Sequence, residues 1–108
     1  MIMEEFVEKI EDIKDSILKF VPARCIYLFG SHAYGTPSDK SDIDIYIVTP
    51  DGVGNLTEIY AKIVVDLSYK KIYVIDLFLN SETMFNKRRV ENVFEKTVYQ
   101  KGRVLYEH

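Results

Sequence analysis

Residues 30–44 read GSHAYGTPSDKSDID and join a turn of small residues to a pair of acidic side chains. Asp42 and Asp44 are two residues apart in an otherwise apolar, β-branched run. Residues at this spacing in a strand point to the same face, so the two carboxylates are predicted to be neighbours, with Ile43 and Ile45 on the opposite face. Their repulsion can be relieved by protonation, by solvent or by a cation. Mg²⁺ is the natural partner because it prefers oxygen ligands.

The beginning of the same stretch is predicted to bind an anion. Gly30 and Ser31 follow the short apolar segment Arg24–Phe29. Small residues allow the backbone to approach a phosphate closely, and a helical turn after them would direct main-chain N–H groups at it. Ser31 and Ser41 can add hydroxyl donors. The sequence therefore predicts a phosphate site beside the two aspartates.

A third acidic residue, Asp76, lies between aliphatic side chains in the β-rich run Lys71–Leu79. An ionised carboxylate in such surroundings is unfavourable unless it is solvated, hydrogen-bonded or bound to a metal. If this run pairs beside the strand of Asp42 and Asp44, three carboxylates converge on one or two metal ions. Each feature alone also has an ordinary structural explanation, because Gly-Ser pairs form common turns and aspartates often flank strands.

Helices and strands are predicted to alternate along the rest of the chain. Apolar residues recur every three or four positions in some segments, and other segments are short runs of β-branched and aromatic residues. This order predicts an α/β fold with helices packed on a small sheet. The predicted elements are a helix at Glu4–Phe20, a strand at Arg24–Phe29, a loop with one short helical turn at Gly30–Lys40, a strand at Asp42–Val48, a helix at Leu56–Leu67, a strand at Lys71–Leu79, a helical region from the cap Ser81 through Val98, and a last strand at Arg103–Tyr106.

Length and composition predict one domain over residues 1–108. The chain is 47% hydrophobic and 29% charged, which is typical of a globular domain. Its formal net charge of −3 disfavours a polymerase-like hold on long nucleic acid. No stretch resembles a signal peptide or a membrane span, and the single cysteine, Cys25, cannot form an internal disulfide. We therefore expect a cytoplasmic protein that has no membrane contact.

Together, the motifs resemble the signature of the polymerase β-like nucleotidyltransferase superfamily. They are Gly30–Ser31, ten intervening residues, Asp42–Asp44 and the later Asp76. The short length and the ending GRVLYE at residues 102–107 are similar to those of the minimal nucleotidyltransferases, which are single catalytic domains of prokaryotes. The similarity runs from about Ile2 to Glu107.

The resemblance implies the nucleotidyltransferase fold, a small mixed β-sheet flanked by helices. It also implies Mg²⁺ as cofactor, ATP or another nucleoside triphosphate as donor, and Asp42, Asp44 and Asp76 as metal ligands and catalytic residues. Gly30 and Ser31 would hold the triphosphate. Proteins of this group often pair with a helical HEPN protein in a toxin–antitoxin module, and some transfer AMP to a tyrosine of that partner.

Three functions remain open at this point. The first is an enzyme that moves AMP to an acceptor hydroxyl of a HEPN-type partner, with Asp76 orienting or deprotonating that hydroxyl. The second is a catalytically silent antitoxin that neutralises its partner by covering it. The third is transfer to a small molecule such as an aminoglycoside, although such enzymes usually carry additional domains. Acidic residues at all three metal-ligand positions favour the enzyme.

Two further features have simpler predicted roles. His32 lies beside Ser31 and is expected to be an exposed loop side chain, although it could touch a phosphate or a ribose. Lys87, Arg88 and Arg89 form a basic cluster. We expect this cluster to be a solvated helix face, with contact to an acidic partner or to phosphates as the alternative.

Overall fold

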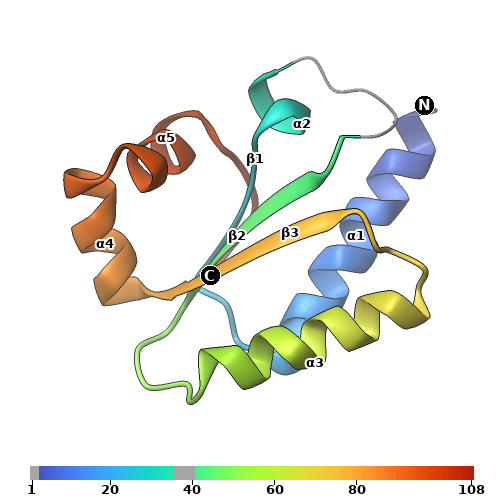
Figure 1. Ribbon diagram of the computed structural model, residues 1–108, viewed down its shortest axis with the longest axis horizontal. Coiled ribbons are helices and arrows are strands. Elements are labelled where there is room, and N and C mark those ends of the chain that lie inside the picture. The colour runs from blue at the N-terminus through green and yellow to red at the C-terminus, as the bar shows by residue number, and fades with distance from the viewer. Residues whose placement is uncertain (1–2, 36–40) are drawn as a thin grey trace.

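The computed structural model describes residues 3–35 and 41–108, which form a mixed sheet flanked by helices (Figure 1). In these residues the strand order is β3-β2-β1-β4, with β2 and β3 parallel and the other neighbours antiparallel. The predicted α/β class is confirmed. The elements are α1 (Met3–Phe20), β1 (Cys25–Phe29), α2 (Ser31–Tyr34), β2 (Ile43–Thr49), α3 (Leu56–Tyr69), β3 (Ile75–Ser81), α4 (Glu82–Glu91), α5 (Val93–Lys101) and β4 (Arg103–Glu107).

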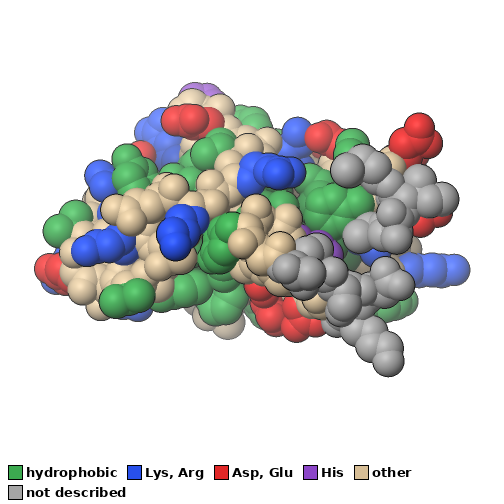
Figure 2. Space-filling view, turned by 90° about the horizontal axis from the view of Figure 1, so that it is seen from above, with side chains coloured by type: hydrophobic (Ala, Val, Ile, Leu, Met, Phe, Trp, Pro, Cys, Tyr) green, Lys and Arg blue, Asp and Glu red, His purple; other side chains and the backbone are tan. Residues whose placement is uncertain are grey.

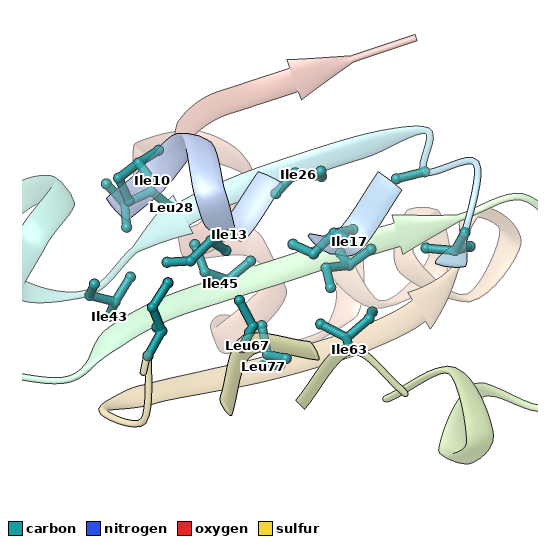
Figure 3. Packing of buried hydrophobic residues seen from close by; sticks show 14 of the residues in the cluster. Ile10, Ile13, Ile17, Ile26, Leu28, Ile43, Ile45, Ile63, Leu67 and Leu77 are labelled. Carbon is teal, nitrogen blue, oxygen red and sulfur yellow. The ribbon is translucent and has the colours of Figure 1, made fainter. Parts of the chain in front are cut away.

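The two faces of the sheet are covered by different helices. Helices α1 and α3 pack on one face, whereas α4 and α5 lie on the other (Figure 1). The larger core forms under α1 and α3, where Ile17, Ile45 and Ile63 are completely buried (Figure 3). Burial of aliphatic side chains of this size contributes about 1.5–3 kcal/mol each.

The alternation of side chains along β2 fixes the side on which its acidic residue lies. Ile43 and Ile45 belong to the core under α1 and α3. Tyr46 and Val48 belong to the smaller core under α4 and α5. Because side chains alternate along a strand, Asp44 shares the face of Tyr46 and Val48. The predicted separation of Asp44 from its isoleucine neighbours is therefore confirmed.

The strand predicted at Lys71–Leu79 begins later than expected. Lys71 has a φ of 61°, and its N–H donates to the carbonyl oxygen of Ser68 over 3.0 Å. The N–H of Ile72 donates to the carbonyl oxygen of Leu67 over 3.0 Å. These bonds satisfy carbonyl groups at the end of α3. The first residues of the β-rich run therefore end a helix, and pairing with β2 begins at Ile75.

The helical region predicted from Ser81 through Val98 is two helices. The Ser81 hydroxyl accepts from the N–H of Met84 over 3.2 Å, so the predicted cap is confirmed. The helix is interrupted at Asn92, whose backbone is extended at φ −110° and ψ 135°. This break turns α5 back onto the sheet, where Val98 is completely buried.

The loop predicted at Gly30–Lys40 contains the expected helical turn, α2. The remainder of that prediction, at residues 36–40, lies outside the described residues. Within residues 3–35 and 41–108, no helix has the length and apolar character needed to cross a bilayer.

Candidate active site

The three predicted aspartates meet at one end of the β2–β3 pair. Asp44 and Asp76 are direct partners in the parallel register, so their side chains share a face of the sheet. Asp42 immediately precedes β2. The carboxyl groups of Asp42 and Asp44 both lie within hydrogen-bonding reach of Asp76. The strands of Asp44 and Asp76 are therefore neighbours in the sheet, which could be stated only as a condition from the sequence.

Asp76 raises the pKa of the other two carboxyl groups. The hydrogen bond with Asp76 is the main cause that raises the pKa of Asp42, and the charge of Asp76 adds to it. Partial burial is the main cause that raises the pKa of Asp44, followed by the negative charge of Asp76. The negative charge of Asp76 contributes to both shifts, so a bound cation would relieve repulsion at this site.

The aspartates suit a partial Mg²⁺ site better than a site in which the protein supplies every metal ligand. Among the described residues, no group of three or more His, Cys, Asp or Glu side chains is already arranged to hold an ion. Mg²⁺ typically binds through one or two carboxylates and completes its shell with water and substrate phosphates. Adjacent aspartate oxygens whose repulsion a cation would relieve provide that kind of partial site.

Gly30 lies directly against the carboxylate of Asp44. Its φ of 73° lies in the left-handed region that favours glycine. A Cβ atom at this position would be 2.1 Å from Oδ2 of Asp44. The strand β1 can therefore turn into α2 beside the aspartates only because residue 30 has no side chain.

The predicted phosphate-binding residues lie around the same turn. Ser31 is the first residue of α2, and Gly30 precedes it as the cap. The first N–H groups of a helical turn have no partner within the helix and can therefore face an anion. Ser41 is linked to α2 through its main-chain carbonyl, which accepts from Nε2 of His32 over 3.2 Å.

His32 is not the freely exposed loop residue that the sequence predicted. Its ring is half-buried and stacks on Phe6 of α1, with ring centroids 5.1 Å apart and planes at 17°. Together with the bond to Ser41, this contact connects α1, α2 and the residue before Asp42. The helical spacing of Phe6 indicated a buried position, but no local pattern linked it to His32.

An aromatic cluster adjoins the carboxylates and was missed from the sequence. Phe29 pairs with Asp44 in the antiparallel register, and Phe78 lies two residues after Asp76 on the same face. Phe94 of α5 contacts both rings, with centroids 5.4 Å from Phe29 and 5.2 Å from Phe78. The two-residue spacing of Asp76 and Phe78 was the available signal.

A buried polar network lies behind this cluster. Oε2 of Glu95 accepts from the Tyr46 hydroxyl over 3.0 Å and from Nε of Arg88 over 2.8 Å. Burial is the main cause that raises the pKa of Tyr46 to about 12.

Arg89 lies over the ring of Tyr99, 4.2 Å from its centroid. The basic cluster is therefore partly structural and is not simply the solvated face that the sequence predicted.

Comparison with known proteins assigns this arrangement to one family. The family model described as a nucleotidyltransferase domain matches residues 6–100. A Methanocaldococcus jannaschii protein, named "Putative protein adenylyltransferase", is 37% identical over 81 residues, covering 75% of this chain and 76% of that protein.

Solved structures share the fold at low sequence identity. A toxin–antitoxin structure with AMP-PNP matches with a TM-score of 0.59 at 22% identity, covering 92% of this chain and 73% of that chain. The tri-AMPylated Shewanella oneidensis HEPN toxin in complex with MNT antitoxin matches with a TM-score of 0.53 at 19% identity, covering 93% of this chain and 71% of that chain.

Proposed function

Because this chain belongs to the nucleotidyltransferase domain family, we propose that it transfers AMP from ATP, with Mg²⁺, to a tyrosine hydroxyl of a HEPN-type helical partner. The observation that carries this proposal is the convergence of Asp42, Asp44 and Asp76 beside the turn at Gly30. The name of the Methanocaldococcus relative supports adenylyl transfer to a protein. The AMPylated HEPN toxin supports the class of partner.

The three aspartates have separate roles in this proposal. Asp42 and Asp44 hold Mg²⁺, which supplies positive charge to the triphosphate oxygens. Asp76, on the neighbouring strand, orients the acceptor hydroxyl and accepts its proton. The acceptor oxygen forms a bond to the α-phosphorus. At the same time, the bond breaks between the α-phosphorus and the oxygen that bridges it to the β-phosphorus. Pyrophosphate then leaves.

The turn between β1 and α2 binds the triphosphate in this proposal. Main-chain N–H groups at Gly30 and Ser31 donate to phosphate oxygens, and the hydroxyls of Ser31 and Ser41 add donors. The bond between His32 and the Ser41 carbonyl supports this role, because it fixes the position of Ser41 relative to α2.

The first experiment is calorimetric titration of ATP into the protein with Mg²⁺ and with EDTA. We expect binding that requires Mg²⁺ and that Asp44→Asn weakens at least about tenfold, because one ligand and its charge are lost. Asp15→Asn is the matched control, since Asp15 is an exposed aspartate of α1. Equal, metal-independent binding to all three proteins would contradict the proposed site.

The second experiment measures transfer by mass spectrometry. A HEPN-type protein co-expressed with this chain should gain the mass of at least one AMP on a tyrosine. The double variant Asp42→Asn/Asp44→Asn should leave it unmodified. Full neutralisation of the partner by this variant would instead support a silent antitoxin that acts by covering.

A further inference from the structure

We propose that Phe78 and Phe94 form an acceptor subsite that binds the aromatic ring of the hydroxyl-bearing residue and so selects tyrosine over serine and threonine. This inference rests on the proposed function and identifies the residues that choose its acceptor. The name "aromatic shelf" is used below for these two side chains.

The aromatic shelf is exposed where a packed ring would ordinarily be covered. Phe78 is 41% exposed and Phe94 is 39% exposed. Phe29, which contacts both, is only 7% exposed. The buried ring thus anchors the shelf from below, while the other two rings retain free surface. Exposed aromatic surface is unfavourable in water and is favoured at sites that bind apolar or planar groups.

The shelf adjoins the acidic residues without an intervening element. Phe78 follows Asp76 by two residues on β3, so the two side chains point to the same face. Their Cα atoms are therefore about 6.6 Å apart, the length of one two-residue repeat of a strand. Figure 2 shows hydrophobic side chains next to acidic ones on the face seen from above.

The short separation favours a ring that itself carries the hydroxyl. In a tyrosine, the hydroxyl is bonded directly to the ring, so a ring on the shelf presents its oxygen to Asp76. In ATP, the whole ribose separates the base from the α-phosphate that reacts. The predicted phosphate turn at Gly30 also lies at the end of β1, whereas Asp76 and Phe78 lie on β3, beyond β2. The shelf therefore suits the acceptor better than the nucleobase.

The shelf is also held in place by its neighbours. Phe78 stacks on Tyr46 with planes at 12° and centroids 6.4 Å apart. Tyr46 is in turn fixed through its hydroxyl by Glu95. Rings whose positions are fixed by packing lose little further entropy when they bind a ligand. A rigid hydrophobic contact of this kind discriminates a phenol from a small aliphatic alcohol by contact with the ring.

The test compares two peptides that differ only in carrying tyrosine or serine. AMP transfer is measured for the wild type, Phe78→Leu, Phe94→Leu and the control Tyr69→Leu, whose side chain is 84% exposed at the end of α3. Leucine keeps apolar bulk and limits the effect on folding. We expect each shelf variant to raise KM for the tyrosine peptide about tenfold, to lose preference over serine, and to bind Mg²⁺ and ATP normally.

Weaker ATP binding with an unchanged tyrosine preference would overturn the inference and assign the shelf to the base. Contact is also measured without turnover, by saturation-transfer NMR of N-acetyltyrosinamide in the presence of AMP-PNP. Ring-proton signals that fall in Phe78→Leu but not in Tyr69→Leu support the shelf even if no transfer occurs. Equal signals in the two variants contradict it, whereas absent transfer by the wild type contradicts only the proposed function.

Discussion

The backbone of Gly30 lies so close to the carboxylate of Asp44 that a Cβ atom at residue 30 would be 2.1 Å from Oδ2. Such contact is far inside van der Waals separation, so one of the two groups would have to move. The carboxylate of Asp44 therefore requires glycine at residue 30, whether or not a ligand is bound. This relationship makes the turn and the aspartate one structural unit.

Gly30→Ala should abolish measurable binding of Mg²⁺ and ATP, because the new methyl group displaces Asp44. It should also destabilise the fold by about 1–3 kcal/mol, since alanine is strained at this positive φ. Gly52→Ala is the control, because Gly52 has a φ of 80° but nothing within 4 Å of the added Cβ. It should lose stability without losing the ligand. Calorimetry and urea unfolding test both variants.

Asp44→Asn should make the ligand-free protein more stable at neutral pH. Burial and the charge of Asp76 raise the pKa of Asp44 in the folded protein. The contribution of Asp44 to stability is therefore fully present below its pKa in the unfolded chain, which is near 4, and is lost as the pH rises through its pKa in the folded protein. Removing the charge should therefore stabilise by less than about 1 kcal/mol at pH 7, because the group is partly exposed and screened. Urea unfolding of both proteins at pH 7 and pH 3 measures this. Lower stability of the variant at pH 7 would contradict repulsion at the site.

Arg88→Met should destabilise the protein more than Arg89→Met does, because Glu95 would keep a buried carboxylate with one fewer donor. Oε1 of Glu95 is buried without a hydrogen-bond partner among the described residues, so the Tyr46 hydroxyl would be left as the donor that the structure shows for this carboxylate. Arg89→Met is the matched control and should lose about 1 kcal/mol or less, the value of an exposed cation–π contact. Equal losses in thermal unfolding would exclude a special role for the Arg88–Glu95 pair.

Asp66→Asn should reduce stability at neutral pH and make it less sensitive to acid. The hydroxyl of Ser16 donates to Asp66 over 2.7 Å and Nζ of Lys19 over 3.0 Å, and these bonds lower its folded pKa. A carboxyl group whose pKa is lowered by folding stabilises the protein at pH values above its pKa in the unfolded chain, which is near 4. That stabilisation is lost as the pH falls through the pKa of the folded protein. The difference between wild type and variant should therefore shrink below about pH 4. A difference that is constant with pH would argue against this linkage.

Much of the site was predictable because its signals are local. The two-residue spacing of Asp42 and Asp44 fixes a shared side of a strand, and Ser81 caps the helix that follows it. Asp76 was conspicuous as an acid in an apolar run. These features depend on backbone geometry within a few residues, so they can be read before the fold is known. Their roles in metal and nucleotide binding stay predictions.

Other features depended on competition between local patterns. Lys71 and Ile72 resemble the strand that follows them, but they complete hydrogen bonds at the end of α3. Asn92 interrupts a region whose apolar spacing continues through it. In both places, satisfying the backbone and packing α5 on the sheet outweighed the propensity of the segment.

The sequence by itself determined the class of fold, the pairing of Asp42 with Asp44 and the glycine turn before them, because each follows from chain geometry over short distances. Only the tertiary structure decided that Asp76 lies opposite Asp44, that Glu95 is buried against Tyr46 and that Phe94 reaches Phe78. These contacts join segments far apart in the chain. They form because burying both faces of the sheet under helices outweighs the entropy lost in closing the intervening loops.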